Sequence, residues 1–176
     1  IKLKDNKEIG SSFNNMGSAY KAFNLLDSAI FFFKKSLFYK SKNGSKSDIA
    51  SVHQNIGGLY NTKKDGKQAL IYHLQSKKAY AEEGNIKMLS QSYYNIGLSY
   101  KLLKDTLNAK KWFTDAVKLA KQVKEKEILA LSYEQLALLG IGKDANDGDY
   151  QEAYNNLQKS VNQRDSILDK NKIAII

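Results

Sequence analysis

The chain has 176 residues, of which 42% are hydrophobic and 26% charged, and it contains no cysteine and no proline. The absence of cysteine excludes a disulfide framework and thiolate metal sites, and the absence of proline fits helices, whose interiors proline breaks. The formal net charge is +10, and no apolar stretch approaches the roughly 18 residues that span a bilayer, so we expect membrane attachment only through segments outside these residues.

Apolar residues recur at helical spacing along the whole chain. The first stripe is Phe13, Met16, Gly17 and Tyr20, at positions i, i+3, i+4 and i+7 of one helix face. A second stripe begins at Ala29, after a short polar joint. Continued through the sequence, the pattern predicts eight helices, at residues 7–23, 26–42, 46–63, 66–83, 86–103, 106–124, 126–141 and 149–172.

The same motif returns every 40 residues. Asn15-Met16-Gly17 is repeated as Asn55-Ile56-Gly57 and Asn95-Ile96-Gly97, and a tyrosine follows three residues later each time. The fourth copy, Gln135-Leu136-Ala137, has Gly140 in place of the tyrosine. A period of this length predicts a stacked array of helix hairpins. We expect residues 1–176 to form one all-α array, with repeats at about 7–45, 46–85, 86–125 and 126–172.

Each hairpin has predicted turn and crossing residues. Asp27, Asp65 and Asp105 are expected to cap the second helices, because a carboxylate there accepts hydrogen bonds from free N–H groups. The pair Gly17 and Ala29 is expected to mark the point where the two helices cross closely, and the same 12-residue spacing recurs in the next two repeats.

These motif residues resemble the tetratricopeptide repeat. The first copy supplies Phe13, Met16, Gly17, Tyr20, Ala29, Phe33 and Ser36. The resemblance implies a right-handed α-solenoid that binds protein or peptide. The repeat departs from the usual 34 residues and lacks the closing proline. Four residues are inserted between Gly140 and Asp149, and the last helix is expected to run past Asp169.

The polar residues beside each first-helix stripe are the candidate peptide-binding residues. The ladder Asn15, Asn55, Asn95 with Gln135 could hold a peptide backbone through amide donors and acceptors, or could bridge adjacent first helices instead. Lys21, Lys101 and Asn61 match only in part the groove residues by which similar proteins clamp a terminal carboxylate, so that specificity is not predicted. The candidates are Asn14, Asn15, Ser18, Lys21, Gln54, Asn55, Asn61, Tyr94, Asn95, Lys101 and Gln135.

No catalytic motif is recognisable, so we expect no enzyme, no catalytic residue, no metal site and no cofactor. His53 and His73 occupy the aromatic places of one hairpin and could face each other in its core, and no third ligand lies on their stripe. Leu131 and Leu138 could form an apolar end of the groove, or could instead be covered by the last helix, which is expected if that helix folds inward.

Positive charge is concentrated in the first half of the chain. Residues 1–40 carry 7 Lys against 3 acids and residues 41–80 carry 7 Lys against 2, whereas residues 121–176 carry 8 basic and 9 acidic groups. This potential could attract an acidic partner. Because 27 of the 28 basic residues are Lys and arginine is preferred for phosphate and base-edge contacts, a lysine-rich composition is the favoured explanation and no nucleic-acid partner is expected.

The segment 163–168 (QRDSIL) resembles the junction that follows tetratricopeptide arrays in Bacteroidetes sensor histidine kinases. The resemblance implies a periplasmic, ligand-sensing input domain of a two-component signalling protein, with a homodimer through the C-terminal helix. The alternatives are a cytoplasmic interaction scaffold without a signalling role and, less favoured, nucleic-acid binding by the basic half. The first residue, Ile1, and the final apolar run suggest that both ends continue into a longer polypeptide.

Overall fold

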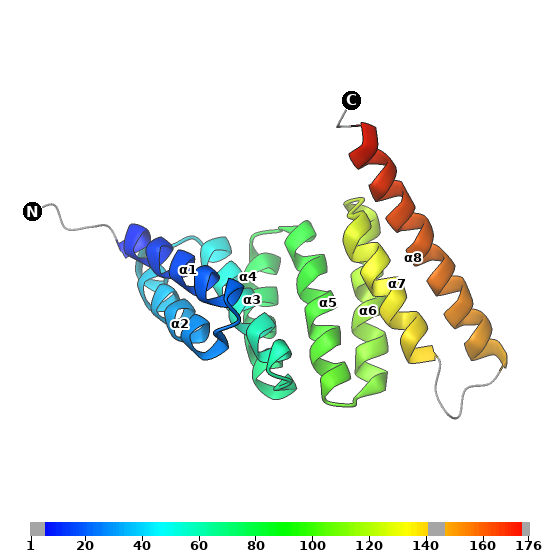
Figure 1. Cartoon of the computed structure of the whole chain (residues 1–176), viewed down its shortest axis with the longest axis horizontal. Coiled ribbons are helices and arrows are strands. Elements are labelled where there is room, and N and C mark those ends of the chain that lie inside the picture. The colour runs from blue at the N-terminus through cyan, green and yellow to red at the C-terminus, as the bar shows by residue number, and fades with distance from the viewer. Residues whose placement is uncertain (1–5, 141–146, 174–176) are drawn as a thin grey trace, which may run out of the picture. The chain divides into compact units, whose positions relative to one another are not determined.

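The computed structural model describes residues 6–140 and 147–173. These residues form eight α-helices and contain no β-strand, which confirms the predicted all-α fold of four hairpins (Figure 1). Every predicted helix boundary lies within two residues of the observed one. In chain order the helices are α1 (Asn6–Ala22), α2 (Leu26–Asn43), α3 (Lys46–Thr62), α4 (Gly66–Glu82), α5 (Ile86–Leu102), α6 (Thr106–Gln122), α7 (Lys126–Gly140) and α8 (Asp147–Ile173).

The described residues group into two compact units. The first contains α1 to α4 and residues 98–103, and the second contains residues 86–97 with α6 to α8. Helix α5 therefore contributes to both. Within the described ranges, no helix combines the length and the apolar character that crossing a bilayer requires.

The core of the first unit lies between consecutive hairpins. Ala29 and Phe33 of α2 pack in one cluster with Val52, Ile56 and Leu59 of α3, and all five are at most 1% exposed. The second helix of one hairpin thus packs on the first helix of the next, which is how a repeat array buries its apolar faces.

Among the residues that the structure describes, helix α1 has no such neighbour on its outer side. Met16 occupies the position of Ile56 and Ile96 in the repeat, yet it is 42% exposed whereas both isoleucines are fully buried. One methionine of the predicted stripe is therefore a surface residue.

The repeated glycine makes room for a ring of the partner helix. A Cβ atom on Gly57 would lie 2.6 Å from the His73 ring, and one on Gly97 would lie 2.6 Å from the Phe113 ring. Gly17 and Phe33 make the same contact in the first hairpin. The small residue was predicted from the approach of two helices, and the structure shows that the closest group is an aromatic ring four residues beyond the repeated alanine.

The two histidines have different neighbours. His73 is fully buried on Gly57, and its Nε2 lies 3.3 Å from the Asn61 side-chain nitrogen. The His53 ring instead contacts Tyr72, with ring centroids 5.9 Å apart. Burial lowers the pKa of His73 to about 4 and also lowers the pKa of His53, so both rings are neutral at physiological pH.

Two of the three predicted aspartate caps are present. The Gln68 N–H donates to Asp65 and the Asn108 N–H donates to Asp105, both at 3.0 Å. The prediction for Asp27 was wrong: α2 begins one position after Leu25, which provides no side-chain cap. Asp27 lies in the first turn of α2 and forms an ion pair with Lys63 at the end of α3.

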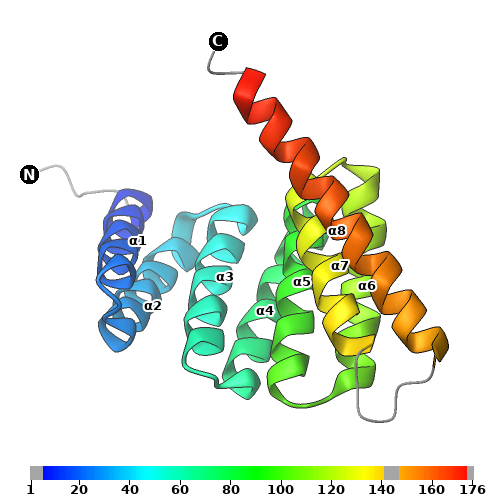
Figure 2. The same cartoon turned by 45° about the vertical axis from the view of Figure 1, so that its right-hand side comes forward.

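The second unit ends in the α7–α8 hairpin (Figure 2). Polar residues of α8 face α7: Asn156 and Ser160 are buried, and Arg164 pairs with Glu134 at 2.5 Å. Helix α8 runs past Asp169 to Ile173, as predicted for an extended last helix. Most of the insertion after Gly140 lies outside the described residues.

The expected cover over the α7 leucines is wrong for Leu138, which is 53% exposed. The α8 residues that are buried are the polar Asn156 and Ser160, and Leu138 lies outside the part of α7 that α8 covers.

Candidate peptide-binding site

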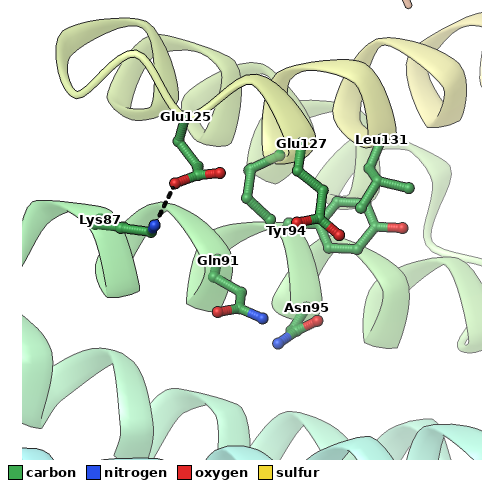
Figure 3. Close-up of a pocket in the computed structure, with 8 residues that line it drawn as sticks. Lys87, Gln91, Tyr94, Asn95, Glu125, Glu127 and Leu131 are labelled. Atoms are coloured by element: carbon green, nitrogen blue, oxygen red, sulfur yellow. Dashed lines mark ion pairs between the residues drawn. The ribbon is translucent and has the colours of Figure 1, made fainter. Parts of the chain in front are cut away.

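A hollow of about 150 Å³ lies between α5 and α7 in the second unit (Figure 3). Gln91 follows Lys87 by four positions, and Tyr94 and Asn95 follow Gln91 by three and four, so these α5 residues share one helix face. The other wall comes from the start of α7 and the residue before it. The lining residues are Lys87, Gln91, Tyr94, Asn95, Glu125, Glu127, Ile128 and Leu131.

An ion pair closes one end of the hollow. The Lys87 ammonium lies 2.8 Å from a Glu125 carboxylate oxygen, and Figure 3 shows this pair on one side with Tyr94, Glu127 and Leu131 grouped on the other. The bond to Glu125 raises the pKa of Lys87, so the lysine stays charged. Because both partners are engaged with each other, their charges largely cancel for a ligand in the hollow.

Tyr94 gives the hollow an aromatic wall with a polar edge. Its ring packs against Phe113, with centroids 5.6 Å apart. Burial raises the pKa of Tyr94, and the nearby Glu134 carboxylate raises it further while Arg164 opposes this effect. The phenol therefore keeps its proton at physiological pH and can donate a hydrogen bond.

The remaining charge of the hollow is negative. Once Lys87 and Glu125 are paired, Glu127 is the charged lining residue without an ion pair among the described residues. Gln91 and Asn95 add amide donors and acceptors. The hollow therefore suits a neutral or basic segment with apolar side chains, and an acidic segment would be repelled by Glu127.

Three predicted site residues belong to the second unit. The structure brings Tyr94 and Asn95 together in the hollow. Gln135 is half-buried, does not line the hollow and already interacts within the chain, as Asn95 also does.

In the first unit, the predicted residues of α1 are the most accessible. Asn15, Ser18 and Lys21 are exposed, although the Ser18 hydroxyl donates to the Asn14 carbonyl at 3.1 Å. The amide oxygens of Asn14 and Gln54 are buried and accept no hydrogen bond from a described residue. The α1 residues therefore form an open polar surface.

On α3, Asn55 is half-buried and Asn61 acts as a bridge between helices. Its side-chain nitrogen approaches His73 of α4, and its oxygen accepts a hydrogen bond from the Ser99 hydroxyl of α5 at 3.1 Å. Both ends of this amide are thus used inside the first unit. Lys101, on the same part of α5, is half-buried and also interacts within the chain.

Helical spacing places Gln91 and Leu131, like Tyr94 and Asn95, beside the apolar stripes of the first helices. Sequence reasoning missed the other four lining residues: Lys87, Glu125, Glu127 and Ile128. Lys87 lies one turn before Gln91 on the predicted face, so extending that face by four residues would have found it. Glu125 and Glu127 flank the start of α7, and their role depends on a contact between two hairpins that helical spacing in one hairpin cannot show.

In residues 6–140 and 147–173, no three histidine or acidic side chains gather as a metal site would require. The hollow contains two glutamates, one lysine, a phenol and two amides. Its chemistry is that of hydrogen bonding and apolar contact.

The arrangement of these hairpins defines an α-helical repeat protein. Comparison with protein families assigns the repeat: the model of the tetratricopeptide repeat matches residues 10–43 and 90–123. The two matched segments start 80 residues apart, which is two of the 40-residue periods read from the sequence. The chain thus contains tetratricopeptide repeats at these two segments, and this type of repeat mediates protein–protein interaction.

Solved structures show the same fold. BtubC (BKLC) from P. vanneervenii superposes with a TM-score of 0.81 at 16% identity, covering 95% of this chain and 67% of that protein. Aspartyl phosphate phosphatase F from Bacillus subtilis gives 0.84 at 14% identity, covering 95% and 43%. The apo form of RapI gives 0.81 at 17% identity, covering 98% and 62%.

At these identities the likeness establishes the fold alone. The chain spans less than two thirds of the length of RapI and of the phosphatase. No curated protein sequence matches the chain.

Proposed function

We propose that the module binds an extended segment of a partner protein on its first helices, and that the α5–α7 hollow is one contact point. The observation that supports this proposal is that Gln91, Tyr94 and Asn95, all on the first helix of the third hairpin, line the same hollow. A primary amide offers both a donor and an acceptor, which is what the N–H and C=O of an extended backbone require.

The hollow would select for side chains as well as for backbone. Ile128 and Leu131 supply apolar surface, and Glu127 supplies one negative charge. We therefore propose a segment with an apolar side chain next to a neutral or basic one at this point. Asn55 on α3, in the first unit, is a separate candidate contact that the asparagine ladder predicts.

Selection from a random peptide library on the immobilised chain tests this proposal. We expect the Asn95→Ala and Tyr94→Ala variants to bind the selected peptides at least about tenfold more weakly, a change of about 1.4 kcal/mol. The Asn55→Ala variant tests the ladder in the same assay. Asn162→Ala, at an exposed position of α8, is the matched control and should bind as the wild type does.

Unchanged binding of the selected peptides by all three face variants would refute the proposed site. Selection of mainly acidic peptides would contradict the role given to Glu127.

We further propose that the module is the sensing input of a two-component protein and acts in the periplasm. Two features support this: the resemblance of residues 163–168 to a sensor junction, and the length of α8, which has 27 residues against 15 to 18 in the other helices. The full-length coding sequence tests it. A signal peptide, a membrane helix after residue 176 and a kinase or DNA-binding output are expected, and a cytoplasmic scaffold would have none of them.

A further inference from the structure

We infer that the outer side of α2 is a second docking site, which takes an acidic segment carrying two apolar side chains. The surface, here named the α2 patch, consists of Phe31, Lys34, Lys35, Phe38, Tyr39 and Lys42. The inference concerns the second helix of a hairpin and does not depend on the site proposed on α5 and α7.

Two phenylalanines form the apolar part of the patch. Phe31 is 53% exposed and Phe38 is 58% exposed. They lie seven residues apart, or about 10 Å along a helix, on the same side of it. A hollow of about 360 Å³ is lined by these two rings together with Lys34, Lys35 and Tyr39.

The exposed rings are held in place by rings beneath them. Phe31 meets Phe32 edge to face with centroids 5.2 Å apart, and Phe38 meets Tyr39 in the same way at 5.3 Å. Phe32 and Tyr39 in turn stack on Phe13 of α1. Because the Phe31 and Phe38 rings are already fixed, they would lose little side-chain entropy when a partner binds.

Positive charge surrounds the two rings. The Lys35 ammonium lies 5.2 Å from the centroid of Phe31, and the Lys42 ammonium lies 4.3 Å from the centroid of Phe38. Lys34 is exposed beside them. None of the three lysines forms an ion pair with a described residue. Three unneutralised ammonium groups around two apolar anchors are complementary to carboxylates around apolar side chains.

The aromatic pair of the patch does not recur in the next two hairpins. The positions equivalent to Phe31 are Ile71 and Lys111, and those equivalent to Phe38 are Lys78 and Lys118. Stacking of the repeats therefore does not require aromatic residues here. Aromatic side chains are enriched in protein interfaces relative to the rest of the protein surface.

An anionic membrane surface would also attract lysine and phenylalanine. The hollow between the rings favours a protein segment, because it offers a concave seat for an individual side chain. The proposed occupant is an amphipathic segment with two apolar residues about 10 Å apart and carboxylates on either side of them.

The test uses a labelled synthetic helix with leucines seven residues apart and flanking glutamates, and measures its fluorescence anisotropy with the whole chain. We expect binding that weakens at high salt and that is lost when the glutamates are replaced by lysines or the leucines by serines. The Phe31→Ala/Phe38→Ala variant should bind at least about tenfold more weakly, and so should Lys35→Glu/Lys42→Glu, which reverses the charge of the patch without removing a ring.

Matched controls come from α6. Leu107 is 82% exposed, and Lys111 is exposed at the position equivalent to Phe31, so Leu107→Ala and Lys111→Glu should bind the acidic helix as the wild type does. Circular dichroism of each variant verifies folding. Equal affinity of both patch variants and the wild type, or no preference for the acidic peptide, overturns the inference. If the chain sediments with phosphatidylserine vesicles at concentrations at which it does not bind the peptide, the inference of a protein partner is overturned in favour of a membrane surface.

Discussion

Neighbouring glycines in α3 have opposite surroundings. Gly57 lies under the His73 ring, which a Cβ atom would approach to 2.6 Å, whereas a Cβ on Gly58 would meet nothing within 4 Å. The sequence shows two adjacent glycines, and only the first repeats with the 40-residue period. The period thus separates a glycine required by packing from one that is not.

We predict opposite effects for alanine at these two positions. Gly57→Ala should destabilise the fold by about 1–3 kcal/mol, because the buried ring must move. Gly58→Ala should stabilise it by up to about 1 kcal/mol, because alanine is the better helix former. Urea unfolding followed by circular dichroism measures both. A stabilised Gly57→Ala variant would show that the ring contact is easily relaxed.

His73 replaces the phenylalanine found at positions 33 and 113, and it makes stability depend on pH. The folded chain keeps this ring neutral because burial lowers its pKa to about 4, whereas the unfolded chain takes up a proton near pH 6.5. Between these pH values the unfolded state binds more protons, so stability is complete above about 6.5 and falls as the pH is lowered toward 4. The full effect is on the order of 3 kcal/mol.

We therefore expect His73→Phe to remove most of this acid sensitivity. At pH 7 the variant can be less stable than the wild type, since the Asn61 nitrogen loses its partner. The decisive quantity is the slope of unfolding free energy between pH 7 and 4.5, measured by chemical denaturation. His53→Phe is the companion variant, because burial lowers the pKa of that ring in the same direction. An unchanged slope in both variants would exclude the histidines as its cause.

At the scale of the element, the hairpin turns share one backbone form. Asn24, Lys64 and Lys104 follow the first helices with φ of 57°, 59° and 60°. Each is followed by the N-cap of the second helix: Leu25, Asp65 or Asp105. The three caps have nearly the same φ and ψ, so the first turn has the geometry of a capped helix without the capping side chain.

This comparison predicts that a cap can be added. Leu25 is 51% exposed, so Leu25→Asp should stabilise the chain by about 0.5–2 kcal/mol, and Asp65→Ala should destabilise it by a similar amount. Thermal unfolding of both variants measures the effect. The added cap should lose its benefit below the pKa of the new carboxylate. A destabilised Leu25→Asp variant at pH 7 would mean that apolar contacts of Leu25 outweigh the cap.

The turns also show what the sequence could and could not predict. Helix ends were found within two residues because periodicity and polar joints coincide there. Asp27 was misassigned because it was chosen for its chemistry, although the 40-residue period relates Leu25 to Asp65 and Asp105. In the site, Tyr94 and Asn95 could be predicted because they lie on one face of one helix. The Lys87–Glu125 ion pair joins two hairpins, so the helical spacing within a single hairpin could not predict it.

At the scale of the whole molecule, α8 carries an apolar stripe that the described residues leave exposed. Its members recur at spacings of three, four and seven residues, the a and d positions of a heptad. All are at least 43% exposed: Tyr154, Leu157, Val161 and Leu168. Such a stripe fits the proposal of a homodimer through the C-terminal helix.

If α8 joins two copies, the mass measured by light scattering after size-exclusion chromatography should rise toward that of a dimer with concentration. Leu157→Glu/Val161→Glu should restore the monomer, because charges at a and d positions oppose burial. Leu107→Glu on α6 is the control. A monomer at every concentration would contradict the homodimer.

Exposure of Met16 has a chemical consequence. A thioether open to solvent is oxidised to the sulfoxide, and at this surface position the added oxygen disturbs no core packing. Dilute peroxide should therefore modify Met16 without unfolding the chain, and mass spectrometry would record the rate. A partner that covers this side of α1 would slow the oxidation of Met16. The oxidation rate therefore reports whether this surface is bound.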